Sequence, residues 1–113
     1  MKNSTSLKKN RDFRLVYNRG KSIANRLLVM FVMPNGLGVN RVGFSVSKKV
    51  GKSVVRSRVT RLLRESVRLS GEQLNTGYDI IILARSSCKG MSFKEAESAL
   101  WHLIKKHNLG LKL

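Results

Sequence analysis

The stretch "RVGFSVSKKVGKSVVRSRVTRLLRESVR", Arg41 to Arg68, contains the two elements that decide the fold. Residues 41–47 alternate between apolar residues and small, polar or basic ones, which is typical of a β-strand with one face in a core. From residue 54 the apolar positions recur at helical spacing, and this pattern predicts an amphipathic helix over residues 54–70. We therefore expect a strand followed by a helix that packs on the same sheet.

The predicted helix has two distinct faces. When its residues are placed 100° apart, the apolar residues fall on one side of the helix, with Ser66 beside them. This apolar seam consists of Val55, Val59, Leu62, Leu63 and Leu69. A basic stripe lies on nearly the opposite side and consists of Arg58, Arg61, Arg64 and Arg68, with Arg56 at its edge. Such like charges repel one another, whereas a guanidinium group binds phosphate through two parallel hydrogen bonds. The stripe therefore predicts a polyanionic partner, and Lys48, Lys49 and Lys52 before the helix extend it.

The whole chain carries an excess of positive charge. Its 113 residues include 23 Lys and Arg against 6 Asp and Glu, for a net charge of +17. This charge favours nucleic acid as the partner, and the length fits one domain over residues 1–113. A solvated basic face without a specific partner and a membrane surface are the alternatives. The longest apolar run, residues 27–33, is too short to span a bilayer.

Other patterns outline the rest of the fold. The expected elements are a loose basic arm over residues 1–9, a helix from Arg11 capped by Asn10, a short strand near 21–24, strands over 25–33 and 78–85, and a last helix with a Ser92–Glu95 capping box. Together with the strand and the helix of the opening stretch, these elements predict an α+β fold, a two-layer α/β sandwich that forms a single domain.

The first predicted helix presents an aromatic face. Phe13, Val16 and Tyr17 fall at positions i, i+3 and i+4, so they lie on one side of it. Two interpretations remain open: the aromatic rings pack into the core, or they stay partly exposed as a stacking surface for bases. On the strand over 41–47, the face with Gly43 and Ser45 leaves room for another group to lie on it.

The sequence offers little for catalysis by the protein. Its carboxylates occur in no paired spacing that suits metal binding, and we interpret His102 and His107 as structural or surface residues. Cys88 is the only cysteine, which fits a reducing compartment, and we interpret it as a loop or core residue. The N-terminus lacks the apolar segment of a secretion signal, so the sequence does not predict secretion. We therefore expect a cytoplasmic binding protein with no metal site, no membrane partner and no catalytic residues of its own.

The order of several motifs resembles one family, the protein subunit of bacterial ribonuclease P. The resemblance is carried by "FRLVYNRGKSIANR" (13–26), "RVGFSVSKKVG" (41–51), "VVRSRVTRLLRE" (54–65) and "YDIIILAR" (78–85). It covers most of the chain and implies an α/β sandwich whose strand–helix–strand unit crosses over with the left hand, against the usual right-handed rule.

The resemblance also implies a function. Members of this family bind a catalytic RNA, and the two together remove 5′ leaders from precursor tRNA. The RNA holds the catalytic magnesium, while the protein, with no cofactor of its own, improves substrate and magnesium affinity. The implied contacts to the RNA subunit are Lys48, Lys49, Lys52, Arg56, Arg58, Arg61, Arg64 and Arg68. The implied leader-binding cleft, between the first helix and the sheet, contains Phe13, Tyr17, Arg26, Phe31, Ser45 and Ser47.

One position departs from the family pattern. The family motif is Arg-Asn-Arg, whereas this chain has Arg56-Ser57-Arg58. A serine hydroxyl lacks the paired donor and acceptor of an amide, so the role of that asparagine does not carry over to Ser57. The alternatives to a ribonuclease P subunit are a ribosomal or chaperone-like RNA-binding protein with no enzymatic role, and a basic helix that reads DNA or anchors to a membrane. A DNA reader would aim side chains at base edges, so we expect no DNA partner.

Overall fold

The computed structural model describes residues 4–110 of the chain. In chain order its elements are β1 (Ser4–Ser6), α1 (Asn10–Arg19), β2 (Lys21–Ala24), β3 (Leu28–Pro34), β4 (Asn40–Ser45), α2 (Ser53–Ser70), a 3-10 turn (Gly71–Gln73), β5 (Tyr78–Ala84), a second 3-10 turn (Ser86–Cys88) and α3 (Phe93–Lys106). Within these residues no helix is long and apolar enough to cross a bilayer.

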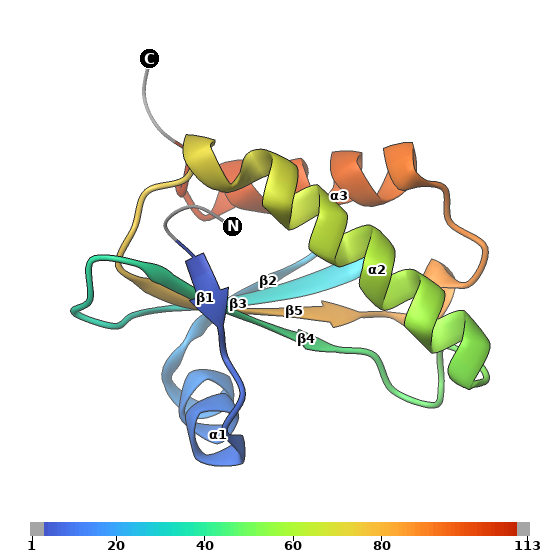
Figure 1. Cartoon of the computed structure of the whole chain (residues 1–113), viewed down its shortest axis with the longest axis horizontal. Helices are drawn as coiled ribbons and strands as arrows, with labels where there is room; N and C mark the ends of the chain where they lie inside the picture. The colour runs from blue at the N-terminus through green and yellow to red at the C-terminus, as the bar shows by residue number, and fades with distance from the viewer. Residues whose placement is uncertain (1–3, 111–113) are drawn as a thin grey trace.

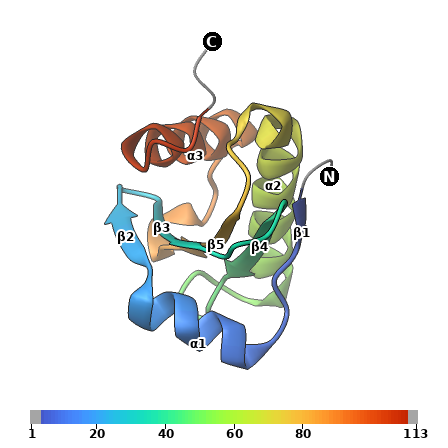
Figure 2. The same cartoon turned by 90° about the vertical axis from the view of Figure 1, so that its left-hand side faces the viewer.

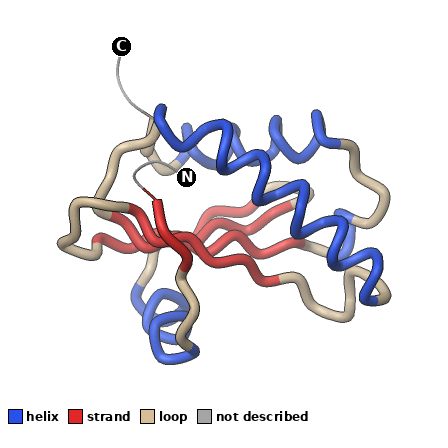
Figure 3. Tube along the Cα trace, in the orientation of Figure 1, coloured by secondary structure: helices blue, strands red, loops and turns tan. Residues whose placement is uncertain are grey.

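The strands form one five-stranded mixed sheet in the order β1-β4-β5-β3-β2. β4 pairs in parallel with both β1 and β5, while β3 pairs antiparallel with β5 and β2. Helices α2 and α3 cover one face of the sheet, and α1 lies on the other (Figures 1 and 2). The predicted α+β class with a helical layer on a sheet is therefore confirmed, and Figure 3 shows the helices and the strands separating into these layers.

The unit β4–α2–β5 crosses over with the left hand. In Figure 1 both strands run toward the right, α2 returns above them, and β5 lies behind β4. About 98% of such parallel connections in proteins are right-handed, so this topology is distinctive. It agrees with the crossover that the family resemblance implied.

Two hydrophobic clusters lie on opposite faces of the sheet. The larger lies between the sheet and the α2–α3 layer, and its fully buried members include Leu28, Met30, Ile82, Leu63, Leu100, Leu103 and Ile104. The smaller lies under α1 and consists of Leu7, Val16 and Ile81, with partly buried aromatic residues against it. Each buried aliphatic side chain contributes about 1.5–3 kcal/mol, so most of the hydrophobic stabilisation arises in the α2–α3 layer.

The buried side of α2 differs from the predicted seam. Val59 and Leu63 are buried as expected, but Leu69 is 48% exposed and Val67 takes a buried place instead. The reason lies in two serines. The Ser66 hydroxyl donates to the Leu62 carbonyl at 2.8 Å, and the Ser70 hydroxyl donates to the Val67 carbonyl at 3.2 Å. Because their hydroxyls are satisfied within the helix, both small residues can face the core.

The prediction of a loose arm over residues 1–9 is wrong for the part of it that the structure describes. Residues 4–6 form β1, and the backbone amide of Leu7 donates to the Val42 carbonyl at 2.9 Å. The Leu7 side chain is buried between α1 and the sheet and anchors the segment. Residues 1–3 lie outside the described residues.

Some predicted boundaries also shift. Lys9, not Asn10, occupies the N-cap of α1, and no side chain caps that end. β3 begins only at Leu28 because the Asn25 side-chain oxygen accepts hydrogen bonds from the amides of Leu27 and Leu28, which holds a turn. The capping box of α3 is confirmed: the Ser92 hydroxyl accepts from the Glu95 amide at 3.1 Å, and the Glu95 carboxylate accepts from the Ser92 amide at 3.0 Å.

Candidate nucleic-acid interface

The arginine stripe of α2 faces away from the core, but its members differ in their partners. The Arg58 guanidinium donates to the Met91 carbonyl at 2.9 Å. The Arg68 guanidinium donates to the Glu65 carboxylate at 2.9 Å, which lowers the pKa of Glu65 and raises that of Arg68. Arg61 and Arg64 are exposed and form no ion pair within the described residues. These two side chains therefore have the greatest freedom to bind an outside anion.

The loop before α2 adds further positive charge. Lys48, Lys49 and Lys52 are all exposed there. The Ser47 carbonyl accepts from the Val50 amide at 3.0 Å, which closes the turn that carries the first two lysines. The loop therefore places three further cations immediately before the N-terminal end of α2.

The Arg56-Ser57-Arg58 motif lies on the first turns of α2. Ser57 is exposed, so it places no buried polar group in the protein. Arg56 is partly buried, and its Nε atom is inaccessible to solvent without a hydrogen-bond partner among the described residues. The backbone carbonyl of Arg56 accepts from the Thr60 hydroxyl at 2.8 Å. The Arg56 side chain is therefore partly covered, unlike those of Arg58, Arg61 and Arg64.

The opposite face of the sheet carries a chain of aromatic rings. The Phe13 and Tyr17 ring centroids are 6.2 Å apart, and the Tyr17 and Phe31 centroids are 4.9 Å apart in an edge-to-face arrangement. Phe13 lies directly on Gly43, where a Cβ atom would come within 2.4 Å of its ring. Phe13 therefore fills part of the room that the glycine leaves. All three rings are only partly buried, so they pack together and keep an exposed portion.

The next row of this face is open to solvent in part. Strand register places Val29, Leu83 and Ser45 side by side, one pleat beyond the row of Phe31 and Gly43. All three side chains in the row are partly exposed. Together with the aromatic rings they form a partly exposed surface, which we call the α1 surface and define by Phe13, Tyr17, Val29, Phe31, Ser45 and Leu83.

Two residues expected in the leader-binding cleft lie apart from these aromatic rings. Arg26 is in the β2–β3 turn, and its guanidinium lies 3.6 Å from the Glu95 carboxylate at the start of α3. Ser47 follows β4, and its hydroxyl accepts from the Lys49 amide at 3.3 Å. The structure thus brings together Phe13, Tyr17 and Phe31 with Ser45 in the next row, but it places Arg26 toward the α3 layer and Ser47 in the basic loop.

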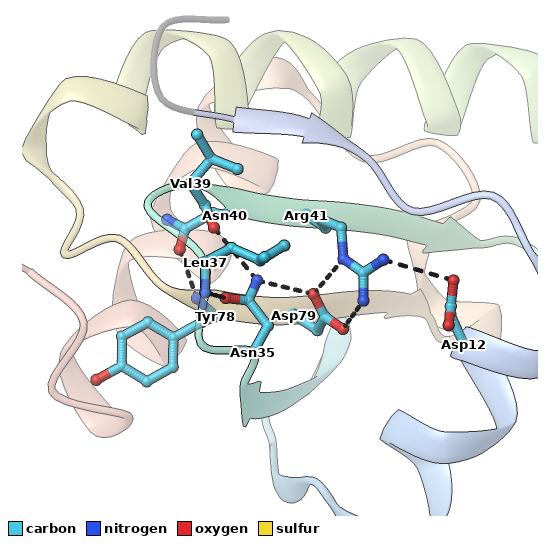
Figure 4. A network of polar contacts seen from close by, with 8 residues as sticks. All are labelled: Asp12, Asn35, Leu37, Val39, Asn40, Arg41, Tyr78 and Asp79. Atoms are coloured by element: carbon cyan, nitrogen blue, oxygen red, sulfur yellow. Dashed lines mark hydrogen bonds and ion pairs between the residues drawn. The ribbon is translucent and has the colours of Figure 1, made fainter.

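A polar network that the sequence pattern did not reveal ties α1 to the sheet (Figure 4). Asp79 is 1% exposed and accepts two hydrogen bonds from Arg41, at 2.8 and 2.6 Å, and one from the Asn35 amide at 2.9 Å. The hydrogen bonds to Asp79 raise the pKa of Arg41. Arg41 also lies 3.5 Å from Asp12 on α1. The signal in the sequence was Asp79, a charged residue within an otherwise apolar strand.

The remaining titratable residues have internal roles. The Cys88 thiol is buried and donates to the Leu27 carbonyl at 3.1 Å, and burial raises its pKa. His107 is hydrogen-bonded to the Met30 carbonyl at 2.9 Å, and burial lowers its pKa. His102 is exposed, as predicted for a surface residue. Within residues 4–110 no three His, Cys, Asp or Glu side chains gather in a way that suits a metal ion.

Together, the fold and the basic face of α2 define a small α+β binding protein with a surface suited to polyanions. A family model described as Ribonuclease P matches residues 1–108. The chain belongs to the ribonuclease P protein family, and the predicted role as the protein subunit of this ribonucleoprotein is confirmed. This result argues against a ribosomal or chaperone-like protein with no enzyme attached.

Relatives and solved structures agree with this assignment. The ribonuclease P protein components of Alkaliphilus oremlandii and Alkaliphilus metalliredigens are 59% and 54% identical over 109 residues, which is 96% of this chain and 96% and 98% of theirs. A Staphylococcus aureus RNase P protein, a mutant with defective mRNA degradation activity, superposes with a TM-score of 0.84 at 34% identity, covering 92% of this chain and 88% of that one. The RNase P protein from Thermotoga maritima gives 0.82 at 30% identity, with 89% and 96% covered.

Proposed function

We propose that this subunit binds the RNA of ribonuclease P through the basic surface of α2 and its preceding loop. The observation that carries the proposal is the difference among the arginines: Arg61 and Arg64 project from α2 without an ion pair in the described part of the chain, whereas Arg58 and Arg68 have internal partners. A planar guanidinium matches the geometry of a phosphate group. Lys48, Lys49, Lys52 and Arg56 extend the proposed interface along the same side.

The α1 surface is the proposed binding site for the single-stranded leader of precursor tRNA. Its aromatic rings offer stacking surfaces that do not depend on base identity. Ser45 in the adjoining row adds a hydroxyl that can bind a phosphate or a base edge. Arg26, which pairs with Glu95 at the start of α3, and Ser47, which lies in the basic loop, are assigned to its periphery.

Catalysis in this proposal lies with the RNA partner. Arginine stays protonated and cannot serve as a general base, so the proposed interface binds RNA without supplying proton transfer. The RNA holds the magnesium ions, and the protein binds no cofactor itself. The protein raises substrate affinity by holding the leader, and it raises magnesium affinity by neutralising phosphate repulsion near the metal sites. The proposed location is the cytoplasm, where precursor tRNA is made.

Reconstitution tests whether the RNA subunit, and not the protein, carries out the cleavage. Precursor tRNA is incubated at low magnesium with the protein alone, with a bacterial ribonuclease P RNA alone, and with both, and 5′ cleavage is followed on a gel. We expect efficient cleavage only with both components, and slow cleavage by the RNA alone that rises with magnesium. Cleavage by protein that has been freed of RNA would contradict the assignment of catalysis to the RNA.

A further inference from the structure

A groove runs along the flank of α2 that faces the edge of the sheet. It consists of adjoining hollows of about 420, 380 and 740 Å³, and both Phe44 and Arg64 line all of them. These volumes fall in the range of roughly 300–1,000 Å³ that is typical of small-ligand sites. We call it the α2 groove, and the lining residues that determine its chemistry are Lys8, Phe44, Arg61, Arg64 and Glu65.

The groove exists because β1 covers only part of the edge of β4. Their pairing ends with Ser6 opposite Val42, followed by the bond from the Leu7 amide to the Val42 carbonyl. After β1 the chain turns away from β4 toward α1 (Figure 2). Within the described residues, the edge of β4 from Phe44 onward therefore has no neighbouring strand on this side. Side chains of α2 line the space beside this edge.

The chemistry of the groove combines one aromatic ring with a basic rim. Phe44 packs partly against the main core and keeps the rest of its ring in the groove. The Arg64 guanidinium carbon lies 5.8 Å from the centre of that ring, within the reach of a cation–π contact. The basic residues that line the groove are Lys8, Arg56, Arg61, Arg64 and Arg68. The carboxylate that lines it, Glu65, is bound by Arg68.

We propose that Phe44 is a stacking site for one unpaired base of the RNA subunit, with Lys8, Arg61 and Arg64 binding the phosphates around it. This inference rests on the proposed function and adds a nucleotide-level contact to it. A regular RNA helix keeps its bases stacked inside and offers phosphates and sugars, so an aromatic ring at the floor would gain nothing there. Single-stranded RNA presents both features that the groove matches: a negative backbone and free base faces.

This site lies on the other side of β4 from the α1 surface, and the two meet at Phe13, which also lines the hollow of about 380 Å³. Successive residues of a strand point to opposite faces of the sheet. Gly43 therefore lies under Phe13 on the α1 side, while Phe44 points toward α2. The protein thus has two aromatic binding surfaces, one on each side of β4, and the proposal assigns the leader to one and the RNA subunit to the other.

The test compares Phe44→Leu with Phe44→Tyr in binding to a ribonuclease P RNA over a series of salt concentrations. Leucine keeps most of the packing against the core but removes the ring, and tyrosine keeps the ring. We expect Phe44→Leu to bind about 5- to 150-fold more weakly with an unchanged salt slope, since stacking one base involves no phosphate. Phe44→Tyr should bind within about twofold of the wild type, because it keeps an aromatic ring on which the base can stack.

Several results would overturn the inference: wild-type binding by Phe44→Leu, an equal loss in both variants, or a salt slope that falls together with the affinity. Arg61→Ala separates this outcome from a failure of the proposed function, because an unchanged slope there would mean that α2 does not face the RNA.

A measurement on the unmodified complex removes any effect of misfolding. After ultraviolet crosslinking and trypsin digestion, we expect a nucleotide adduct on the peptide of residues 42–48. Adducts confined to peptides with Phe13, Tyr17 or Phe31 would contradict the proposal.

Discussion

The two faces of the sheet are built in different ways. Against α2 and α3 the sheet buries a continuous apolar core, with Leu28, Ile82 and Leu100 almost fully enclosed. Against α1 it buries only a small cluster, and the contact is completed by half-exposed rings and by the ion pair between Arg41 of the sheet and Asp12 of α1. One face therefore supplies most of the stability, while the other holds its helix with fewer contacts and leaves aromatic surface available for binding.

The largest expected effect concerns the well-packed face. Leu63→Ala removes a side chain with 0% exposure from the contact between α2 and the sheet. The free energy of unfolding should fall by about 3–5 kcal/mol, because a cavity remains in the core. Leu69→Ala on the same helix is the control and should change it by less than about 0.5 kcal/mol, since that side chain is largely exposed. Chemical denaturation measures both, and equal losses would contradict the buried side of α2 given above.

The second effect concerns the ion pair under α1. Arg41→Ala leaves the Asp79 carboxylate buried with the Asn35 amide as its remaining side-chain partner. Removing one partner of a buried ion pair lowers the free energy of unfolding by about 3–5 kcal/mol. Because Arg41 is partly exposed, we expect a loss of about 2–3 kcal/mol here. Arg14→Ala, at an exposed position of α1, is the control for loss of charge. A loss below about 0.5 kcal/mol for Arg41→Ala would show that the network does not hold α1.

The elements that sequence predicted well are those with strong local signals. The capping box at Ser92, the alternation of residues 41–45 and the amphipathic α2 all follow from neighbouring residues. β1 was missed because three residues gain order only by pairing with a strand that lies 36 positions later, as Ser4 does with Asn40. No local pattern in "STS" contains that information.

The side-chain partners of the arginines show the same limit. The Arg68–Glu65 pair spans three residues on one helix, so sequence spacing could have revealed it. The bond from Arg58 to the Met91 carbonyl joins segments that only the fold brings together. For this reason the sequence predicted a uniform stripe. In the structure Arg58 and Arg68 are held by hydrogen bonds to Met91 and Glu65, whereas Arg61 and Arg64 have no hydrogen-bond or ion-pair partner among the described residues.

A third prediction concerns binding by the α1 face. Phe13→Leu keeps an apolar contact on Gly43 but removes the ring from the aromatic chain. Affinity for leader-bearing precursor tRNA, in the complex with the RNA subunit, should fall by about 1–3 kcal/mol if the ring stacks on a base. Affinity for mature tRNA should stay the same, because the leader is absent. Equal losses for the two RNAs would point to damage of the α1 packing instead.

The arrangement of the α1 surface was predicted from the sequence only in part. Phe13 and Tyr17 share a helix face, so their proximity follows from helical spacing. The position of Phe31 against Tyr17 depends on how α1 crosses the sheet, which the Asp12–Arg41–Asp79 contacts fix. Arg26 was assigned by resemblance alone, and its ion pair with Glu95 directs it toward α3.

The central claim is that Arg61 and Arg64 present phosphate-binding groups to the RNA subunit. Its most direct test is the salt dependence of RNA binding for the double variant Arg61→Ala/Arg64→Ala. The control is Lys105→Ala/Lys106→Ala, which removes the same charge from exposed positions at the end of α3. We expect the log–log slope to fall by about 1.4–1.8 units for the arginine variant and to stay unchanged for the lysine variant. Equal changes in the two variants would contradict the claim, because they would show that only net charge matters.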